Sequence, residues 1–452
     1  MEFLSKIFRF AGGVSVKGCK EATENVPLVR LPRPALVTVS MSQHIGAPSV
    51  PCVKPGDRVK RYQRIGDAAG VVSSAVHTPF SGVVRAIGPS ATASTRVADA
   101  ITIAVDPEDV ETDTSLAPMD WAASQPADIV ARVREAGVVG AGGAGFPTPV
   151  KLSPPPGKKI DTVIINGAEC EPYLNGDNRL MVERPVEVWT GAKIIMRAVG
   201  ASRAIVAIED NKPAAIEAMR KAIGDEDGVI AVLPHSYPQG SEKHVVYTVT
   251  GRVVGTGRLP ADVGCLVENI WTTVTICHAV RDGIPSVIRT VTVAGSVVAR
   301  PSNFAAPIGA SVADLVAAAG GFVRQPAKAI CGGPMMGFAM PSLDVPITKT
   351  CSGLVFLAPE EVFEFSSSPC IGCGRCLRAC PLSLQPAEIA QASEAGDIPL
   401  AERLHAMNCF ECGSCAFVCP AHRPLVQHMR RVKAAIAARS RAAAAGGKGG
   451  AR

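Results

Sequence analysis

The stretch CIGCGRCLRACP, residues 370–381, has the same cysteine spacing as CFECGSCAFVCP, residues 409–420. Both follow C-x2-C-x2-C-x3-C-P, in which three thiolates on one tight loop bind three irons of a cubane and the fourth ligates the other cluster of a pair. Zinc sites use separated pairs of ligands, so three cysteines at successive spacings of three exceed what one ion takes from a single loop. The two stretches therefore predict two [4Fe-4S] clusters.

Crossed ligation is expected because the gap before each last cysteine starts a helix that leads away from its own loop. One cluster would take Cys370, Cys373, Cys376 and Cys419, and the other would take Cys380, Cys409, Cys412 and Cys415. The segment between the motifs is long enough for helices that let the two copies fold together. The other cysteines are expected to be small buried apolar side chains: Cys19, Cys52, Cys170, Cys265, Cys277, Cys331 and Cys351.

Composition indicates a folded chain of several domains that neither spans a membrane nor binds nucleic acid. Of the 452 residues, 47% are apolar and 19% are charged, and the length suits three or four domains. Seven Lys or Arg and no acid lie in residues 429–452, so the rest of the chain is close to neutral despite the formal charge of +6. With 4% aromatic residues and no basic stripe, stacking on single strands is not expected.

The stretch GAGGAGFPTPVKL, residues 140–152, fits G-x-G-x-x-G but not the context of a dinucleotide fingerprint. A true fingerprint follows a strand and opens a helix, whereas this loop follows a helix-like stretch, residues 127–137, and leads into a Pro-rich segment. Four glycines in six positions exceed what a plain turn requires. Their exposed N–H groups can lie against a flat ring or a phosphate, with Lys151 close by.

A regular βαβαβ series follows the glycine loop. Strands are predicted at 161–166, 203–210 and 228–234, and helices at 186–200 and 212–223. Parallel sheets bind ligands outside the carboxyl ends of their strands, and Glu169 and Glu171 lie at one such end. This pair suits hydrogen bonds from a ribose or a nicotinamide amide. A general acid and base for hydrolysis is the alternative, although no nucleophile accompanies the pair.

Several motifs in one order make the chain resemble the RnfC family of Rnf electron-transport complexes. They are AGVVGAGGAGFPTPVKL, INGAECEPYLNGDNRLM, SYPQGSEKHVVYTVTG, CGGPMMGF and the two cysteine motifs. The resemblance covers nearly the whole chain, and that family shares its flavin domain with the NADH-binding subunit of respiratory complex I. It implies a noncovalent FMN that exchanges a hydride with NAD(H), and electron transfer through the two clusters to membrane partners that pump Na⁺ or H⁺.

The resemblance also implies roles for individual residues, and no catalytic side chain beyond the cofactors. FMN would be held by Gly142, Gly143, Gly145, Lys151, Asn166, Glu169, Asn269 and Thr272, and NADH by Phe146 and Glu171. The chain departs from complex I at Ala168, which replaces an acid of the flavin motif, and at Ser241, where complex I has the first Glu of a GEE sequence.

The predicted fold class is multidomain α/β and α+β. We expect an N-terminal docking segment (1–30), a lipoyl-like barrel-sandwich domain (31–108), a Rossmann-like FMN/NADH domain (125–284), a β-grasp or SLBB domain (285–358), an α-helical bacterial-type two-cluster ferredoxin domain (365–432) and a basic Ala/Gly-rich tail (433–452). The sandwich domain has no Lys between residues 65 and 84 to carry a cofactor, so it is expected to be a scaffold. The amphipathic N-terminus either docks on a lipid surface or partner, or packs on its own domain.

The Rnf resemblance implies a peripheral subunit on the cytoplasmic side of the inner membrane. Its partners would be NAD(H), the other Rnf subunits and, indirectly, ferredoxin, with the anionic membrane surface a further candidate for the basic tail. One alternative is a soluble flavin and iron–sulfur NADH reductase similar to cobalamin reductase, but there the glycine loop lies near the N-terminus with no sandwich domain ahead of it. Another is an assembly subunit with vestigial sites, which the intact cysteine motifs disfavour.

Overall fold

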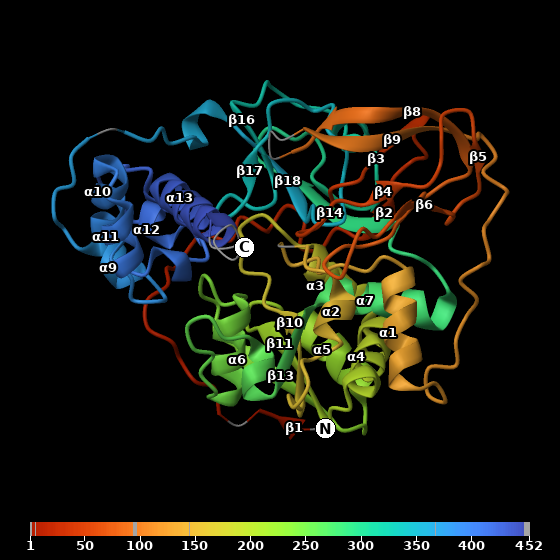
Figure 1. Cartoon of the computed structure of the whole chain (residues 1–452), viewed down its shortest axis with the longest axis horizontal. Coiled ribbons are helices and arrows are strands. Elements are labelled where there is room, and N and C mark those ends of the chain that lie inside the picture. The colour runs from red at the N-terminus through yellow and green to blue at the C-terminus, as the bar shows by residue number, and fades with distance from the viewer. Residues whose placement is uncertain (1, 5, 94–96, 144, 367, 447–452) are drawn as a thin grey trace.

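The computed structural model describes the chain apart from residues 1, 5, 94–96, 144, 367 and 447–452, so the end of the expected basic tail lies outside the described residues. Figure 1 shows the flavin domain below the sandwich and β-grasp domains, with the ferredoxin-type helices at one side. In the described part of the chain, no helix has both the length and the apolar character needed to cross a bilayer.

The flavin domain is built on a parallel sheet with strand order β1-β12-β11-β10-β13. Its strands are β1 (Glu2–Phe3), β10 (Thr162–Gly167), β11 (Arg203–Glu209), β12 (Gly228–Leu233) and β13 (Cys265–Asn269). Its helices are α1 (Pro126–Glu135), α2 (Thr148–Lys151), α3 (Gly176–Glu183), α4 (Pro185–Val199), α5 (Pro213–Ile223), α6 (Glu242–Thr250), α7 (Ile270–Cys277) and the turns η1 (Pro260–Val263) and η2 (His278–Asp282). The βαβαβ elements expected from the sequence are all present, with ends within one residue of the prediction.

The central strands are continuous apolar runs because helices cover both faces of the sheet. Five of the six residues of β10 are buried, and all but the first residue of β11 are buried. Helix α4 begins at Pro185 and stops at Gly200, whose φ of 68° is the left-handed conformation that favours glycine. The chain runs from β10 to β11 and β12 on one side and returns to β13 on the other. The crevice between β10 and β13 is therefore the topological switch point where such sheets bind ligands.

Two β domains lie over the carboxyl edge of this sheet. The sandwich domain holds β3 (Leu36–Ser40), β4 (Val50–Pro51), β5 (Arg58–Val59), β6 (Arg64–Asp67), β7 (Val76–His77), β8 (Gly82–Ala91) and β9 (Val97–Val105). The β-grasp domain holds β14 (Ile288–Ala294), β15 (Ser302–Pro307), α8 (Val312–Ala318), β16 (Lys328–Cys331), β17 (Phe338–Ala339) and β18 (Gly353–Leu357). Its sheet is completed by β2 (Leu28–Arg30), which pairs with β15.

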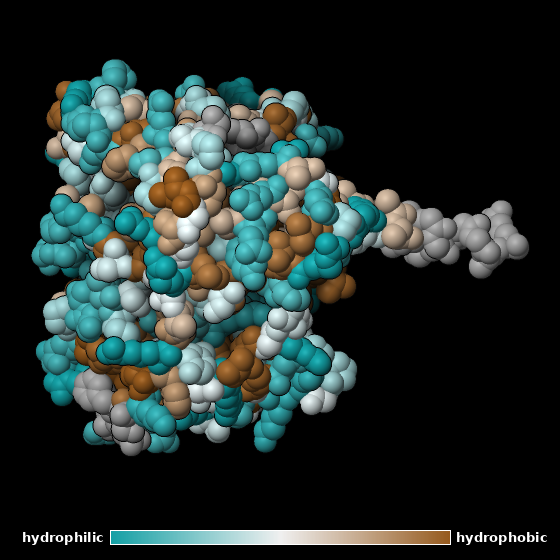
Figure 2. Space-filling view, turned by 90° about the vertical axis from the view of Figure 1, so that its left-hand side faces the viewer, coloured by the Kyte–Doolittle hydropathy of each residue, from teal (hydrophilic) through white to brown (hydrophobic). Residues whose placement is uncertain are grey.

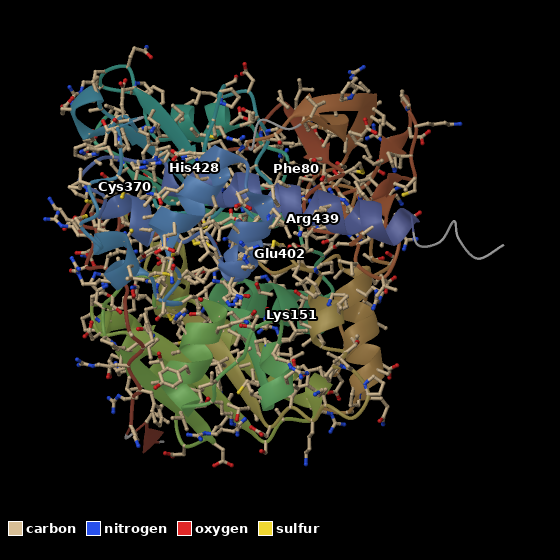
Figure 3. The ribbon with its side chains drawn as sticks, turned by 60° about the vertical axis from the view of Figure 1, so that its left-hand side comes forward. Phe80, Lys151, Cys370, Glu402, His428 and Arg439 are labelled. Carbon is tan, nitrogen blue, oxygen red and sulfur yellow. The ribbon has the colours of Figure 1, made fainter. Side chains whose placement is uncertain are left out.

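The ferredoxin-type domain is helical, as expected. After the turn η3 (Pro359–Glu361) it contains α9 (Arg375–Ala379), α10 (Pro386–Ala395), α11 (Ile398–Arg403), η4 (Ala406–Asn408), α12 (Ser414–Phe417) and α13 (Leu425–Gly446). Helix α13 continues through residue 433, where the tail was expected to begin, because Val432 and Ile436 are buried in the domain core. Arg439 forms an ion pair with Glu402 of α11 (Figure 3). The later part of α13 projects from the body of the protein (Figure 2).

The N-terminal segment packs on the chain itself, which is one of the two alternatives left open by the sequence. Leu4 and Ile7 pack against the apolar cluster on the α6 side of the sheet. The ring of Phe10 lies 4.4 Å from that of His244 on α6, in an edge-on arrangement. The segment then passes between the flavin and ferredoxin-type domains, where Gly13 N–H donates to Ala379 and Val14 N–H donates to Tyr237.

Candidate functional site

The glycine loop lies at the switch point between β10 and β13. The N–H of Ala141 donates to Oγ1 of Thr272 at 2.9 Å, and a Cβ on Gly142 would lie 3.6 Å from that of Asn269. Gly143 has a φ of +127°, and a Cβ there would meet no atom of the described residues within 4 Å, its chain neighbours aside. The loop therefore presents an open glycine surface above the strand ends, as a cradle for a flat ring requires.

The neighbouring domains hold this loop in place. Gly145, expected to line the flavin, lies at a domain junction, since a Cβ there would lie 2.8 Å from Thr350 and 3.1 Å from His44. Buried Arg289 donates to the carbonyls of Ala141, at 3.0 Å, and Cys351, at 2.9 Å. Its Nη1 atom is buried without a hydrogen-bond partner among the described residues. An unsatisfied guanidinium N–H beside the loop suits an anionic or carbonyl-bearing ligand.

A row of hydrogen bonds joins the ends of β10 and β13. The carboxylate of Glu169 accepts the N–H groups of Asp177 and Asn178 at the start of α3, at 2.9 and 3.1 Å. Asn269 caps α7 and also donates to Asp177 Oδ2 at 2.6 Å. Burial and the nearby Glu169 charge raise the pKa of Asp177 to about 7. Because these side chains hold one another in place, they form a rigid polar edge beneath the glycine loop.

Two of the expected flavin contacts are engaged within the protein. Lys151 (Figure 3) lies between Glu242 on α6, at 2.8 Å, and Glu268 on β13, at 3.7 Å. Burial lowers the pKa of Lys151, but these two carboxylates outweigh burial and raise it to about 12. Asn166 uses its amide to donate to the carbonyl of Gly240 and accept from Ala168 N–H, so it fixes the loops around the site.

Glu171 faces the β-grasp domain. Its two oxygens accept the N–H groups of Met335, at 3.1 Å, and Met336, at 2.8 Å, in the CGGPMMGF segment. A Cβ on Gly333 would lie 2.2 Å from Glu171 Oε2, so only glycine permits this approach. Burial is the larger effect on the pKa of Glu171 and raises it to about 7, against the opposing effect of the two N–H groups. Phe146, the other expected nicotinamide contact, lies at the end of the glycine loop, where its carbonyl accepts Gly140 N–H.

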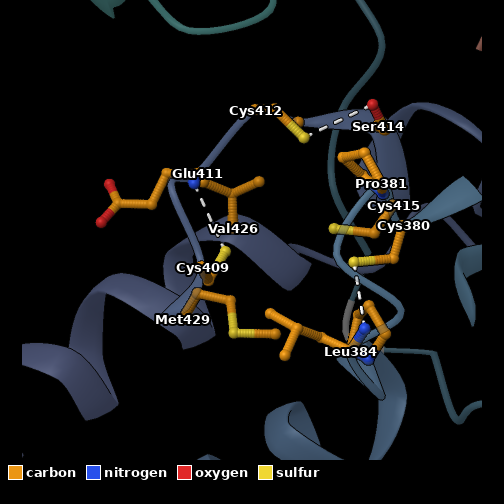
Figure 4. A pocket seen from close by; sticks show the side chains of 12 residues that line it. Cys380, Pro381, Leu384, Cys409, Glu411, Cys412, Ser414, Cys415, Val426 and Met429 are labelled. Atoms are coloured by element: carbon orange, nitrogen blue, oxygen red, sulfur yellow. Dashed lines mark hydrogen bonds between the residues drawn. The ribbon is translucent and has the colours of Figure 1, made fainter. Parts of the chain in front are cut away.

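The structure brings Cys380 of the first cysteine motif to Cys409, Cys412 and Cys415 of the second. All four line one pocket, with Leu384, Val426 and Met429 among its other walls (Figure 4). Leu384 N–H donates to the sulfur of Cys380, and Glu411 N–H to that of Cys409, both at 3.3 Å. Four sulfurs with backbone donors around one apolar pocket fit a [4Fe-4S] cluster. We refer to this set as the inner cysteine set.

Three members of the other expected set, Cys370, Cys376 and Cys419, also come together across the two motifs. Cys376 and Cys419 pack against one apolar cluster, which contains Leu425 and also Cys415 of the inner set. Burial first, and then the charges of Cys370 and Cys419, raise the pKa of the Cys376 thiol. Cys373 is exposed, and Cys370 lies near the edge of the molecule in Figure 3. We refer to Cys370, Cys373, Cys376 and Cys419 as the outer cysteine set.

The flavin domain holds both chain segments of the inner set. Buried Tyr237, which follows β12, donates its hydroxyl hydrogen bond to the carbonyl of Cys412 at 2.6 Å. His244 on α6 bonds through Nε2 to the carbonyl of Pro381, next to Cys380, at 3.1 Å. Tyr237, Cys170 and Cys412 form one apolar cluster, so side-chain packing runs without interruption from the end of β10 to the inner set.

Comparison with known proteins assigns a family to this arrangement. Family models match residues 8–108 as an RnfC barrel sandwich hybrid domain, 133–278 as a Nuo51 FMN-binding domain, 290–339 as an SLBB domain and 369–422 as a 4Fe-4S dicluster domain. The RnfC-type protein of the proton-translocating ferredoxin:NAD(+) oxidoreductase complex of Clostridium ljungdahlii is 43% identical over 84% of this chain and 83% of its own length. Its counterpart in the Na(+)-translocating complex of Acetobacterium woodii is 41% identical over 96% of this chain and 98% of its own.

The chain belongs to the RnfC family. The predicted family and fold class are thereby confirmed. Among solved structures, an NAD⁺-reducing [NiFe]-hydrogenase in its H2-reduced state has a similar fold, with a TM-score of 0.50 and 20% identity over 70% of this chain and 63% of that chain. At this identity the likeness concerns the fold alone.

Sequence reasoning missed the residues that join the domains of this RnfC-family chain. Tyr237 and His244 lie in the SYPQGSEKH motif, but their contacts are more than a hundred residues away in sequence. Lys349 is buried and donates to Ala75 of the sandwich domain, at 2.8 Å, and Gly137 of the flavin domain, at 2.6 Å. The sequence around these residues, SYPQGSEKH and ITKTCS, is largely polar and gives no sign that their side chains are held between domains.

Proposed function

We propose that this chain carries one noncovalent FMN and two [4Fe-4S] clusters, and exchanges electrons between NAD(H) and the ferredoxin-reacting side of an Rnf complex. The chain is an RnfC-type subunit of an ion-translocating ferredoxin:NAD⁺ oxidoreductase, with an FMN-binding domain and a dicluster ferredoxin domain. The single observation that carries the proposal is the hydrogen bond from Tyr237 of the flavin domain to Cys412 of the inner cysteine set.

FMN would lie on the open glycine surface at the switch point. Gly142 and Gly143 leave space for the ring, while Asn269 and Thr272 fix the strand end and loop beneath it. Arg289 holds the loop through the carbonyl of Ala141, and its buried Nη1 has no hydrogen-bond partner in the described part of the chain. When bound, FMN supplies the chemistry that accepts one hydride, with its two electrons, and releases these electrons singly.

Nicotinamide would approach from the side of Phe146 and Glu171. A carboxyl group with a pKa of about 7 can either donate or accept a hydrogen bond near neutral pH. In the structure it accepts two N–H groups of the CGGPMMGF segment, so a nicotinamide amide would have to share or replace them. This makes Glu171 a contact between the nucleotide site and the β-grasp domain.

The two cysteine sets would hold clusters with different neighbours. The inner set contacts the flavin domain through Tyr237 and His244, whereas the outer set includes the exposed Cys373 beside the exposed Ile371. Each bound cluster supplies single-electron transfer. A cluster in the inner cysteine set would therefore be placed to exchange electrons with the flavin. A cluster in the outer cysteine set would be placed to exchange electrons with another protein.

The proposed partner proteins are inferred from the complexes of the relatives and from the exposed outer cysteine set. The relatives in Clostridium ljungdahlii and Acetobacterium woodii are subunits of complexes named for proton and Na⁺ translocation. We place this chain as a peripheral subunit on the cytoplasmic side of the inner membrane, where its outer cysteine set meets other Rnf subunits and exchanges electrons with ferredoxin indirectly. The basic end of α13 would lie near anionic lipid.

Cofactor analysis of the reconstituted protein tests the proposal. The wild type should release one FMN on acid treatment, reduce ferricyanide with NADH, and show reduced-cluster EPR signals after NADH is added. Gly143→Val should abolish FMN binding because its side chain fills the open surface above the loop. Gly56→Val is a matched control, since Gly56 also has a positive φ and open surroundings but lies in the sandwich domain. Wild-type protein without acid-releasable flavin would contradict the proposal.

A further inference from the structure

Two cysteines outside the cluster motifs lie in contact in the β-grasp domain. Cys331 ends β16, and Cys351 lies in the loop before β18, which is the neighbour of β16 in the sheet. Their sulfur atoms are 3.4 Å apart. The Cys351 side chain is buried, whereas Cys331 is partly exposed. A disulfide requires about 2.05 Å between the sulfurs, so forming one would draw these two sulfurs more than about 1 Å closer together.

The two thiols have different environments. The S–H of Cys331 donates to the sulfur of Cys351. This hydrogen bond lowers the pKa of the Cys351 thiol. Burial raises that pKa by a smaller amount, and the positive charge of nearby Arg289 lowers it further. The same bond, together with burial, raises the pKa of the Cys331 thiol. Cys351 therefore has the larger thiolate fraction of the two, while Cys331 is the partly exposed residue of the pair.

The pair lies between two parts of the proposed nucleotide site. Cys331 begins the CGGPMMGF segment, whose Met335 and Met336 N–H groups bind Glu171 of the flavin domain. The carbonyl of Cys351 is held by Arg289, which also holds the glycine loop at Ala141. Movement of either cysteine would therefore be transmitted to the edge of the nucleotide site.

We propose that Cys331 and Cys351 form a reversible disulfide with low-molecular-weight disulfides, and that this bond loosens the hold of the CGGPMMGF segment on Glu171. The Cys331 thiol passes its proton to the sulfur of Cys351, to which it is hydrogen-bonded, as it attacks one sulfur of the small disulfide. The departing small thiolate takes up that proton and leaves as a thiol, so a mixed disulfide remains on Cys331 and a thiolate on Cys351. The Cys351 thiolate then attacks the Cys331 sulfur and releases the second small thiol. Two protein thiols are oxidised, and one small disulfide is reduced to two thiols. Drawing Cys331 towards Cys351 moves the start of the segment into the β-grasp core and away from Glu171.

The bond itself is tested on the cofactor-loaded full chain. The protein is incubated with oxidised glutathione, free thiols are alkylated, and the unfolded protein is digested with trypsin. Cleavage after Lys349 separates the two cysteines, so the disulfide joins two tryptic peptides and fragmentation locates it. We expect the joined peptides in the wild type and their loss with reduced glutathione. Cys331→Ser should abolish them, whereas Cys277→Ser, which replaces a buried cysteine of α7, should not.

The effect on the segment is tested by hydrogen exchange of the same samples. Oxidation should speed exchange in residues 332–338 about fivefold, as expected when one hydrogen bond is weakened, and reduction should restore it. Cys331→Ser should show no change with glutathione redox state. Absence of the joined peptides in the wild type, or their presence with unchanged exchange in residues 332–338, would overturn the proposal.

The kinetic consequence rests on the proposed function. If Glu171 contacts nicotinamide, the KM for NADH in ferricyanide reduction should change in parallel with hydrogen exchange. An unchanged KM together with altered exchange would support the disulfide and count against the nicotinamide role of Glu171. The two proposals can therefore fail separately.

Discussion

The two cysteine motifs have the same spacing but opposite surroundings. In the second motif, residues 412–415 are all buried, and Phe410 packs with Tyr237 of the flavin domain. In the first motif, residues 371–373 are all exposed, and the side chain of Ile371, which corresponds to Phe410, is 68% exposed. Spacing therefore specifies ligands, whereas the neighbours of each loop specify which cluster would face the flavin and which would face solvent.

Removal of single ligands should have the largest effect and would test how the motifs combine. Cys419→Ala should damage the cluster of Cys370, Cys373 and Cys376, because Cys419 lies close enough to Cys376 to raise the pKa of its thiol, as Cys370 does. Cys380→Ala should damage the inner cluster, whose pocket it lines. Each variant should lose about half of the iron and one of two EPR signals.

Comparison with variants in the unambiguous ligands provides the control. The spectrum of Cys419→Ala should match that of Cys370→Ala, and the spectrum of Cys380→Ala should match that of Cys409→Ala. If Cys419→Ala instead matched Cys409→Ala, each motif would bind its own cluster, and the inner and outer sets would have to be redrawn.

Phe410→Ser should have the second-largest effect, which is a loss of stability at the interface between the second cysteine motif and the flavin domain. Its side chain packs with Tyr237 and Val16, and its ring lies 5.7 Å from that of His244. Loss of this apolar contact should destabilise the interface by about 1–3 kcal/mol. The measurement is the rate of inner-cluster loss under mild denaturant, followed by the inner EPR signal. A rate equal to that of the wild type would remove Phe410 from the interface.

Much of this architecture could be predicted from the sequence because its signals are local. The apolar runs of β10 to β12 and the caps of α4 specify the parallel sheet, and the cysteine spacing specifies a cluster domain. The ends of these elements agree with prediction because glycine and proline mark them.

The contacts between domains could not be predicted, because they depend on pairs far apart in the chain. The close approach of Gly145 to Thr350 and His44 was not predicted, because these residues belong to two other domains. Glu171 was expected to bind nicotinamide, but its backbone partners are about 160 residues later, and backbone N–H groups leave no signature in a sequence. Cys52 was expected to be buried but is exposed, since a lone cysteine carries no periodic pattern.

Tyr237→Phe should have a moderate effect on electron transfer, and this effect should be limited to the cluster of the inner cysteine set. It removes the hydroxyl that donates to the Cys412 carbonyl, a loss of about 1 kcal/mol for one neutral hydrogen bond. We expect slower reduction of the inner cluster by NADH, with an unchanged KM for NADH in ferricyanide reduction. Tyr247→Phe is the matched control, because Tyr247 lies on α6 beside Phe8 and away from the cysteines. Equal effects of the two variants would assign Tyr237 a purely structural role.

Ile371→Ser should have the smallest effect, and it most directly tests the comparison. Ile371 and Phe410 each follow the first cysteine of their motif, so the two serine variants make the same change at equivalent positions. Because Ile371 is 68% exposed, its replacement should alter the free energy of unfolding by less than about 0.5 kcal/mol. Cluster content and EPR spectra of the isolated protein should match the wild type. If Ile371→Ser destabilised the cluster of the outer cysteine set as much as Phe410→Ser destabilises the inner one, the loop of residues 371–373 would be packed rather than exposed. The proposal that electrons leave the chain through the outer cysteine set would then fail. If it left the isolated protein unchanged but slowed electron transfer in the assembled complex, the exposed isoleucine would belong to the surface that meets the next electron carrier.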